Sequence, residues 1–175
     1  MVRGLHVLAL LLALAPRVAL AQATAAGVLD AYRRPTLSYA AGDASGCGNP
    51  FVYAWTSDRG EALSVRASVE ALQIPSARTF DLAAAPPGLE VRVHVFDRAI
   101  ASRRFCTDVG VGPIVEEEWR AVAGVATIEV EPRQRATGLY RATIRISGAG
   151  FISSSGVRVS MPQPVTLSAI VGRGM

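Results

Sequence analysis

The sequence contains no lysine, and all 18 of its basic residues are arginines. This absence excludes chemistry that needs an ammonium group, such as a phosphate-binding loop with its lysine, a Schiff base to a carbonyl, or a Ser-Lys dyad. Histidine is nearly as scarce, because only His6 and His94 occur. The chain also lacks G-x-S-x-G, H-E-x-x-H and C-x-x-C motifs. We therefore expect neither a cofactor nor a metal site.

Long apolar runs are also lacking, with one exception at the start of the chain. The run from Leu5 to Ala15 is too short to span a bilayer, which takes about 20 residues, and small residues follow it at Ala19 and Ala21. This order is typical of a secretory signal peptide. We expect residues 1–21 to be removed and residues 22–175 to form one secreted or periplasmic domain without a transmembrane segment.

Charge of either sign is sparse. The formal net charge is +4, and two arginines, Arg3 and Arg17, belong to the predicted signal peptide, so the mature domain carries a net charge of +2. A charge this small argues against nucleic acid or an anionic membrane as the partner.

Alternation of apolar and polar residues with a period of two is abundant. It predicts strands that have one face on a core and the other in water. The alternating segments are 51–55, 62–69, 89–97, 125–131, 139–147, 157–161 and 165–171. Turn sequences rich in glycine and proline separate them. The sequence predicts an all-β fold, a single antiparallel β-sandwich (immunoglobulin-like or jelly-roll-like) of eight to ten short strands, with at most one short helix, around residues 70–73.

Two consecutive segments predict a hairpin with a definite register. Pairing Glu131 with Leu139 places Glu129 opposite Arg141 on the polar face and brings the apolar residues of both strands together on the other face. We interpret the polar face as solvated.

The two cysteines, Cys47 and Cys106, are expected to form a disulfide, because cysteines in an oxidising compartment normally pair. Cys47 precedes the predicted strand Phe51–Trp55, and Cys106 lies inside the segment "RFCTDV", which we interpret as another strand. In the chain-entropy model, closing a loop of about 60 residues stabilises the fold by roughly 4 kcal/mol. A reactive thiol or a metal ligand is the alternative, but the mature chain has one histidine to assist it.

Three aromatic residues alternate along the strand after Cys47. Phe51, Tyr53 and Trp55 could form the bulky inner face of the fold, or a flat platform on which sugar rings stack. Because Val52 and Ala54 between them are also apolar, neither face is expected to be exposed. We favour a place in the core and keep the three rings as the candidate ligand-binding residues.

Carboxylates offer a different function. A small secreted hydrolase could use Glu116–Glu118 or the loop at Asp43, because two carboxylates can hydrolyse a glycoside. However, neighbouring residues in a strand point apart, so we interpret 116–119 as a solvated loop or the start of a strand. A Ser-His-Asp triad would have to use His94, which is predicted on a solvated polar face, and no serine stands out as its partner.

These observations favour a non-enzymatic binding or structural module at the cell surface or in the periplasm. The expected partner is a protein or a carbohydrate. The hydrolase is the alternative.

Overall fold

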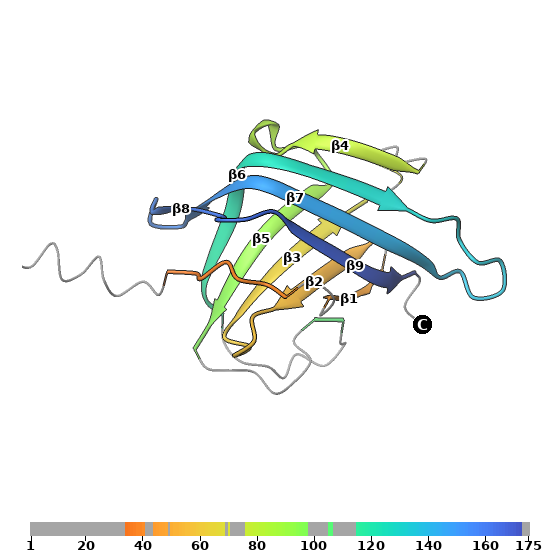
Figure 1. Cartoon of the computed structure of the whole chain (residues 1–175), viewed down its shortest axis with the longest axis horizontal. Helices are drawn as coiled ribbons and strands as arrows, with labels where there is room; N and C mark the ends of the chain where they lie inside the picture. The colour runs from red at the N-terminus through yellow and green to blue at the C-terminus, as the bar shows by residue number, and fades with distance from the viewer. Residues whose placement is uncertain are drawn as a thin grey trace, which may run out of the picture. The chain divides into compact units, whose positions relative to one another are not determined.

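The computed structural model describes residues 34–40, 44–48, 50–68, 70, 76–97, 105–106 and 115–172. In these ranges nine strands form one antiparallel sheet, which confirms the predicted all-β class and the number of strands. Their order along the chain is shown in Figure 1, and their bounds are β1 (Ala44–Cys47), β2 (Phe51–Trp55), β3 (Glu61–Ala67), β4 (Ala77–Asp81), β5 (Leu89–Phe96), β6 (Val115–Val130), β7 (Tyr140–Ser153), β8 (Arg158–Ser160) and β9 (Val165–Val171). A 3-10 helix, η1 (Leu82–Ala84), follows β4.

The sheet is organised around two long strands. Neighbouring strands follow the order β1-β2-β3-β5-β6-β7-β8, while β4 pairs with β6 and β9 pairs with β7. The first part of β6 pairs with β5 and its last part with β4, whereas β7 pairs first with β9 and then with β8. β6 and β7 have 16 and 14 residues, so the expectation that all strands are short is wrong for these two.

Glycines allow these long strands to bend, as Figure 1 shows for β6. The register between β6 and β7 shifts on both sides of Ala123. Gly124 has a φ of +100°, and a Cβ there would lie 2.6 Å from the Cα of Ala149. A register shift of this kind is typical of a β-bulge, in which an extra residue bends the strand and increases its twist. The bends let β6 and β7 each contribute to two regions of the sheet.

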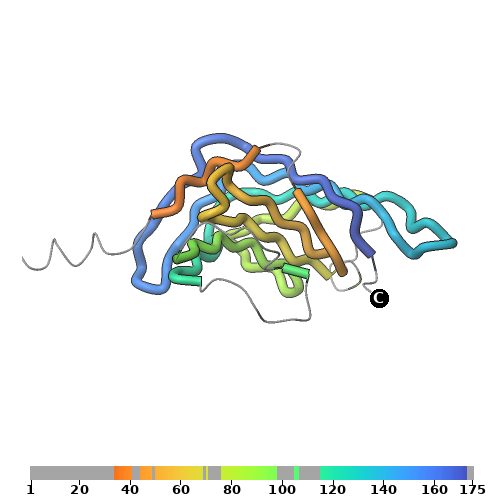
Figure 2. Tube along the Cα trace, turned by 90° about the horizontal axis from the view of Figure 1, so that it is seen from below, coloured from red at the N-terminus to blue at the C-terminus, as the bar shows by residue number. Residues whose placement is uncertain are grey.

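The first and last parts of the sheet meet. An isolated antiparallel bridge joins Gly48 to Gly172, and a Cβ on Gly46 would lie 2.6 Å from a methyl group of Val171. Figure 2 shows β1 and β9 side by side. Because every described strand belongs to one continuous sheet, the two-sheet sandwich and its immunoglobulin-like or jelly-roll-like subtype stay predictions.

One face of the sheet carries the main hydrophobic core. It receives alternate residues of β2, β3, β5, β6, β7 and β9. Its members with no exposed surface include Val52, Ala54, Leu63, Val65, Val93, Trp119, Ile128, Ile144, Ile146, Phe151 and Leu167. At about 25 cal/mol per Å² of buried apolar area, this core supplies the main driving force for folding.

Residues 34–40 are attached to the sheet by a buried carboxylate. Glu61 of β3 accepts hydrogen bonds from the amide N–H of Thr36 (2.6 Å) and the amide N–H of Leu37 (3.0 Å). The hydroxyl of Tyr39 also donates to it. Burial, followed by the negative charge of Glu61 and this hydrogen bond, raises the pKa of Tyr39 well above its usual value. Glu61 therefore anchors the segment that leads into β1.

The hairpin of β6 and β7 has a register that differs from the predicted one. Glu129 lies opposite Thr143 and not opposite Arg141, while Arg141 forms an ion pair with Glu131 at 3.5 Å. The turn is longer than expected and closes on itself through the hydrogen bond from the N–H of Gln134 to the carbonyl of Leu139 (2.8 Å). The predicted faces are still right, because a shift of two residues preserves the alternation.

Other parts of the prediction fall short or lie outside the described residues. The alternation did not predict β1, which has only four residues, or β4, which buries only Phe80. Of the predicted helix around 70–73, only Glu70 is described, and the predicted signal peptide is not described. In the described part of the chain, no helix has the length and apolar character needed to cross a membrane.

Candidate functional site

The aromatic residues of β2 lie on the face of the sheet opposite the main core. Val52 and Ala54 point into that core and are fully buried. Phe51, Tyr53 and Trp55 alternate with them and lie on the opposite face, so they are not part of the main core. The favoured place in a core is right for Tyr53, which is buried, and in part for Trp55, which packs against a second, smaller core of Ala62 and Phe96. The alternation of residues 51–55 was visible in the sequence. Because both alternating sets are apolar, the sequence did not show which set faces the main core.

Phe105 lies over the centre of this outer face. Its ring centroid is 4.8 Å from that of Tyr53 and 5.4 Å from that of Phe51. It stacks on Trp55, with a centroid distance of 5.5 Å and an angle of 30° between the planes. Phe96 of β5 completes the group, which we call the outer aromatic cluster: Phe51, Tyr53, Trp55, Phe96 and Phe105.

The disulfide holds Phe105 in this position. Cys47, at the end of β1, and Cys106 are bonded, with Cα atoms 5.9 Å apart, as predicted from the cysteine count and the expected compartment. The segment around Cys106 was expected to be a strand, but Phe105 and Cys106 lie in a bend, and Cys106 has a φ of +59°. Because Phe105 is the neighbour of the bonded Cys106, the bridge fixes its ring against β2.

The outer aromatic cluster is covered in its middle and accessible at its sides. Tyr53 is only 8% exposed, while Phe51, Trp55 and Phe105 are partly exposed. The ring planes of Tyr53 and Trp55 are inclined by 84°, so the rings form a contoured surface. The guanidinium of Arg66 adds a positive charge, 5.3 Å from the ring centroid of Phe51.

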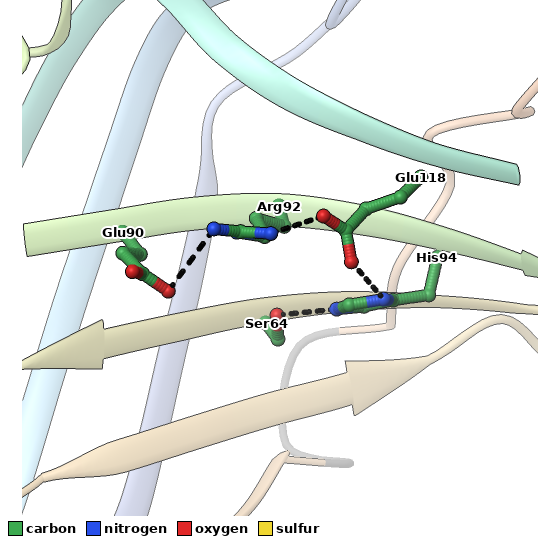
Figure 3. A network of polar contacts seen from close by, with 5 residues as sticks. All are labelled: Ser64, Glu90, Arg92, His94 and Glu118. Carbon is green, nitrogen blue, oxygen red and sulfur yellow. Dashed lines mark hydrogen bonds and ion pairs between the residues drawn. The ribbon is translucent and has the colours of Figure 1, made fainter. Parts of the chain in front are cut away.

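A polar network adjoins the cluster on the same face of the sheet (Figure 3). The Oγ of Ser64 on β3 lies 2.9 Å from Nε2 of His94 on β5. Nδ1 of His94 lies 3.4 Å from Oε2 of Glu118 on β6. Arg92 contacts the other oxygen of Glu118 and lies 3.5 Å from a carboxyl oxygen of Glu90. Three neighbouring strands thus bring a hydroxyl, an imidazole and a carboxylate together.

His94 is on the predicted face but is less solvated than expected. Its side chain is 12% exposed, and its ring centroid lies 5.3 Å from that of Phe105. The sequence did not single out Ser64 as its partner. Knowledge of how β3 pairs with β5 would have revealed this partner, because Ser64 lies opposite Arg92 and therefore diagonal to His94. That register could not be chosen from the alternation alone.

The three carboxylates at 116–118 are divided between the two faces of β6. Glu116 and Glu118 point outward, whereas Glu117 points into the protein and is 6% exposed. Burial raises the pKa of the Glu117 carboxyl, and the nearby hydroxyl of Ser153 lowers it by a smaller amount. The Glu117 carboxyl and this hydroxyl do not form a hydrogen bond of normal geometry. The segment is the start of a strand, as one of the two interpretations had it, and the strand separates Glu117 from Glu116 and Glu118. The hydrolase that would use these carboxylates stays a prediction. Asp43 lies outside the described residues.

Among the described residues, no group of three or more His, Cys, Asp or Glu side chains is arranged to hold a metal ion. Comparisons of the chain with protein-family models, with curated proteins and with solved structures found no match.

Proposed function

We propose that this protein is an exported binding module, and that the accessible sides of the outer aromatic cluster receive a protein or carbohydrate partner at the cell surface or in the periplasm. The observation that carries this proposal is the placement of Phe51, Trp55 and Phe105. These rings lie outside the main core and are partly exposed, so they retain apolar surface for a partner, and aromatic residues dominate the energetics of interfaces.

The disulfide supports this use of the face. A bonded Cys106 keeps Phe105 against Trp55 before any partner arrives. A surface that is already ordered loses less side-chain entropy on binding than a mobile one. The cation Arg66 beside Phe51 supplies a polar contact at the edge of the surface.

The geometry favours a shaped partner over a flat one. Because the planes of Tyr53 and Trp55 are inclined by 84°, a single sugar ring cannot stack on both. An apolar segment of a protein, or a branched carbohydrate with several faces, fits such a surface better.

The experiment compares binding by the purified mature protein with binding by Trp55→Ala and Ile170→Ala. Ile170 on β9 is 48% exposed and lies outside the cluster, so it is a matched control. A glycan array and capture from the exported fraction supply carbohydrate and protein partners. We expect Trp55→Ala to weaken binding at least tenfold, which corresponds to about 1.4 kcal/mol, while Ile170→Ala binds normally. Equal loss in both variants would contradict the proposed surface.

Export is tested separately. We expect N-terminal sequencing of the exported protein to begin at Gln22 or Thr24. An intact Met1 on the exported protein would contradict the predicted signal peptide.

A further inference from the structure

The polar network orders its atoms as a nucleophile, a base and an orienting acid. The hydroxyl of Ser64 meets Nε2 of His94 at 2.9 Å, and the carboxylate of Glu118 faces Nδ1 at 3.4 Å (Figure 3). Serine hydrolases on unrelated folds use this same order of atoms. We propose that Ser64 is a nucleophile toward carboxylic esters, that His94 is its general base, and that Glu118 is a positioning residue.

The charges around His94 select the ring tautomer that this chemistry needs. An ionised carboxylate accepts hydrogen bonds only, so Glu118 favours the proton on Nδ1. Nε2 then presents its lone pair to the hydroxyl of Ser64. Arg92 contacts Glu118 and also faces Glu90, which limits the rotation of the Glu118 side chain.

The surroundings indicate the class of ester. Tyr53 lies opposite Ser64 in the sheet, and the ring of Phe105 lies 5.3 Å from the ring of His94. These rings provide contacts for an apolar acyl or aryl group. Ser64 itself is buried, and electrostatic interactions are stronger where bulk water is excluded.

The reaction balances with groups that the chain and the substrate provide. Oγ of Ser64 bonds to the ester carbonyl carbon while its proton moves to Nε2 of His94. The bond between that carbon and the alcohol oxygen then breaks, and the alcohol takes the proton from Nε2. Water attacks the acyl-serine, transfers a proton through Nε2 back to Oγ, and the acid leaves.

The expected rate is low. Ser64 lies within β3 and pairs with residues of both β2 and β5, so the amides of this strand are engaged in the sheet. The residue opposite Ser64 is Arg92, whose guanidinium already contacts Glu118 and Glu90 and therefore gives a developing oxyanion only partial stabilisation. Removal of one oxyanion donor from a serine hydrolase costs about 10²–10³-fold in rate. We therefore expect reaction with activated esters such as p-nitrophenyl acetate, and no cleavage of amides.

The test is covalent labelling of the mature, disulfide-bonded protein with a small fluorophosphonate. This probe reacts with a serine that a base activates, so it needs no knowledge of the natural substrate. We expect one probe per chain, located on Ser64 by peptide mass mapping and absent in Ser64→Ala. Ser45, which is exposed on β1 and shares the row of Tyr53 and Ser64, is the internal control for non-specific reaction. Labelling of Ser45 in place of Ser64 would overturn the proposal.

Variants of the base and of the positioning residue make the test specific. We expect His94→Ala to slow labelling and ester hydrolysis by at least about 10²-fold. Glu118→Gln should slow both, whereas Glu116→Gln, on the same face of β6, should leave both unchanged. Thermal midpoints establish that each variant is folded. Equal labelling of wild type and folded His94→Ala would overturn the proposal and leave the network as a structural one.

The pH dependence of the wild type covers the case in which His94→Ala does not fold. Labelling should fall as the solution is made acid, because a protonated imidazole cannot accept the serine proton. A flat profile would overturn the proposal. The inference goes beyond the proposed binding function and does not depend on it: Trp55→Ala tests the surface, and Ser64→Ala tests the chemistry.

Discussion

Phe105 stacks on Trp55 at a centroid distance of 5.5 Å, although the two residues are 50 positions apart in the sequence. The neighbouring Cys106 is bonded to Cys47, which lies a few residues before β2. One covalent link therefore orders the partly exposed Phe105 against the strand that carries the partly exposed Phe51 and Trp55. The disulfide serves the outer face as well as the stability of the chain.

Removal of the disulfide should therefore have two separable effects. We expect Cys47→Ala with Cys106→Ala to lower the free energy of unfolding by up to about 4 kcal/mol, because the unfolded chain regains entropy. The same variant should increase iodide quenching of Trp55, since Phe105 loses its anchor. Trp119, the other tryptophan, is fully buried and contributes little to that quenching. An unchanged thermal midpoint would contradict the stabilising role.

A methyl group on Gly46 should separate β1 from β9. The added Cβ would lie 2.6 Å from Val171 and 2.7 Å from the carbonyl oxygen of Phe51, closer than atoms can approach. We expect Gly46→Ala to cost about 1–3 kcal/mol, the usual range for overpacking. Denaturant unfolding measures this loss. The neighbouring exposed Ser45→Ala should change stability by less than about 0.5 kcal/mol, and an equal effect of both variants would refute the close approach.

Glu117 should make the stability depend on pH. Burial raises its pKa in the folded protein, so the stability that it contributes is present at acid pH and is lost as the pH rises through the folded pKa. We expect Glu117→Gln to be more stable than wild type at neutral pH and to lose this advantage below the usual pKa range of glutamate. Thermal midpoints measured from pH 4 to pH 8 test this. Parallel profiles for the two proteins would show that Glu117 is not the cause.

Glu61 should anchor residues 34–40. Hydrogen bonds to a charged group contribute about 1.5–3 kcal/mol each, and Glu61 accepts them from Thr36, Leu37 and Tyr39. We expect Glu61→Gln to lower the free energy of unfolding by about that amount and to expose the segment before β1 to proteases. Tyr39→Phe should have a smaller effect of the same kind. Proteolysis that is no faster than in the exposed control Glu116→Gln would contradict the anchor.

Much of the fold could be predicted because alternation reports which residues share a face. β2 and β9 begin and end where the sequence placed them, and β3 and β5 agree within two residues. Pairing was harder to predict than strand position. In the hairpin of β6 and β7, a shift of two residues leaves every face unchanged, so the pattern could not distinguish Glu129–Arg141 from Glu131–Arg141.

The candidate site was harder to predict because it depends on contacts between distant segments. The pairing of Cys47 with Cys106 was predictable from the cysteine count and the expected oxidising compartment. The face on which the Trp55 side chain lies could not be predicted from the sequence, because the face formed by Val52 and Ala54 is also apolar and could equally pack on the core. The contact of Ser64 with His94 depends on the register of β3 with β5, which no local pattern specifies.

The most direct test of the proposed binding surface is site-specific photo-crosslinking in cells that produce the protein. A photoreactive phenylalanine analogue replaces Trp55 in one variant and Ile170 in another, and both are irradiated at equal abundance. We predict a discrete adduct, in which the protein is joined to one partner, from position 55 and none from position 170. Absence of an adduct at position 55, or the same adducts at both positions, would contradict the outer aromatic cluster as the binding surface.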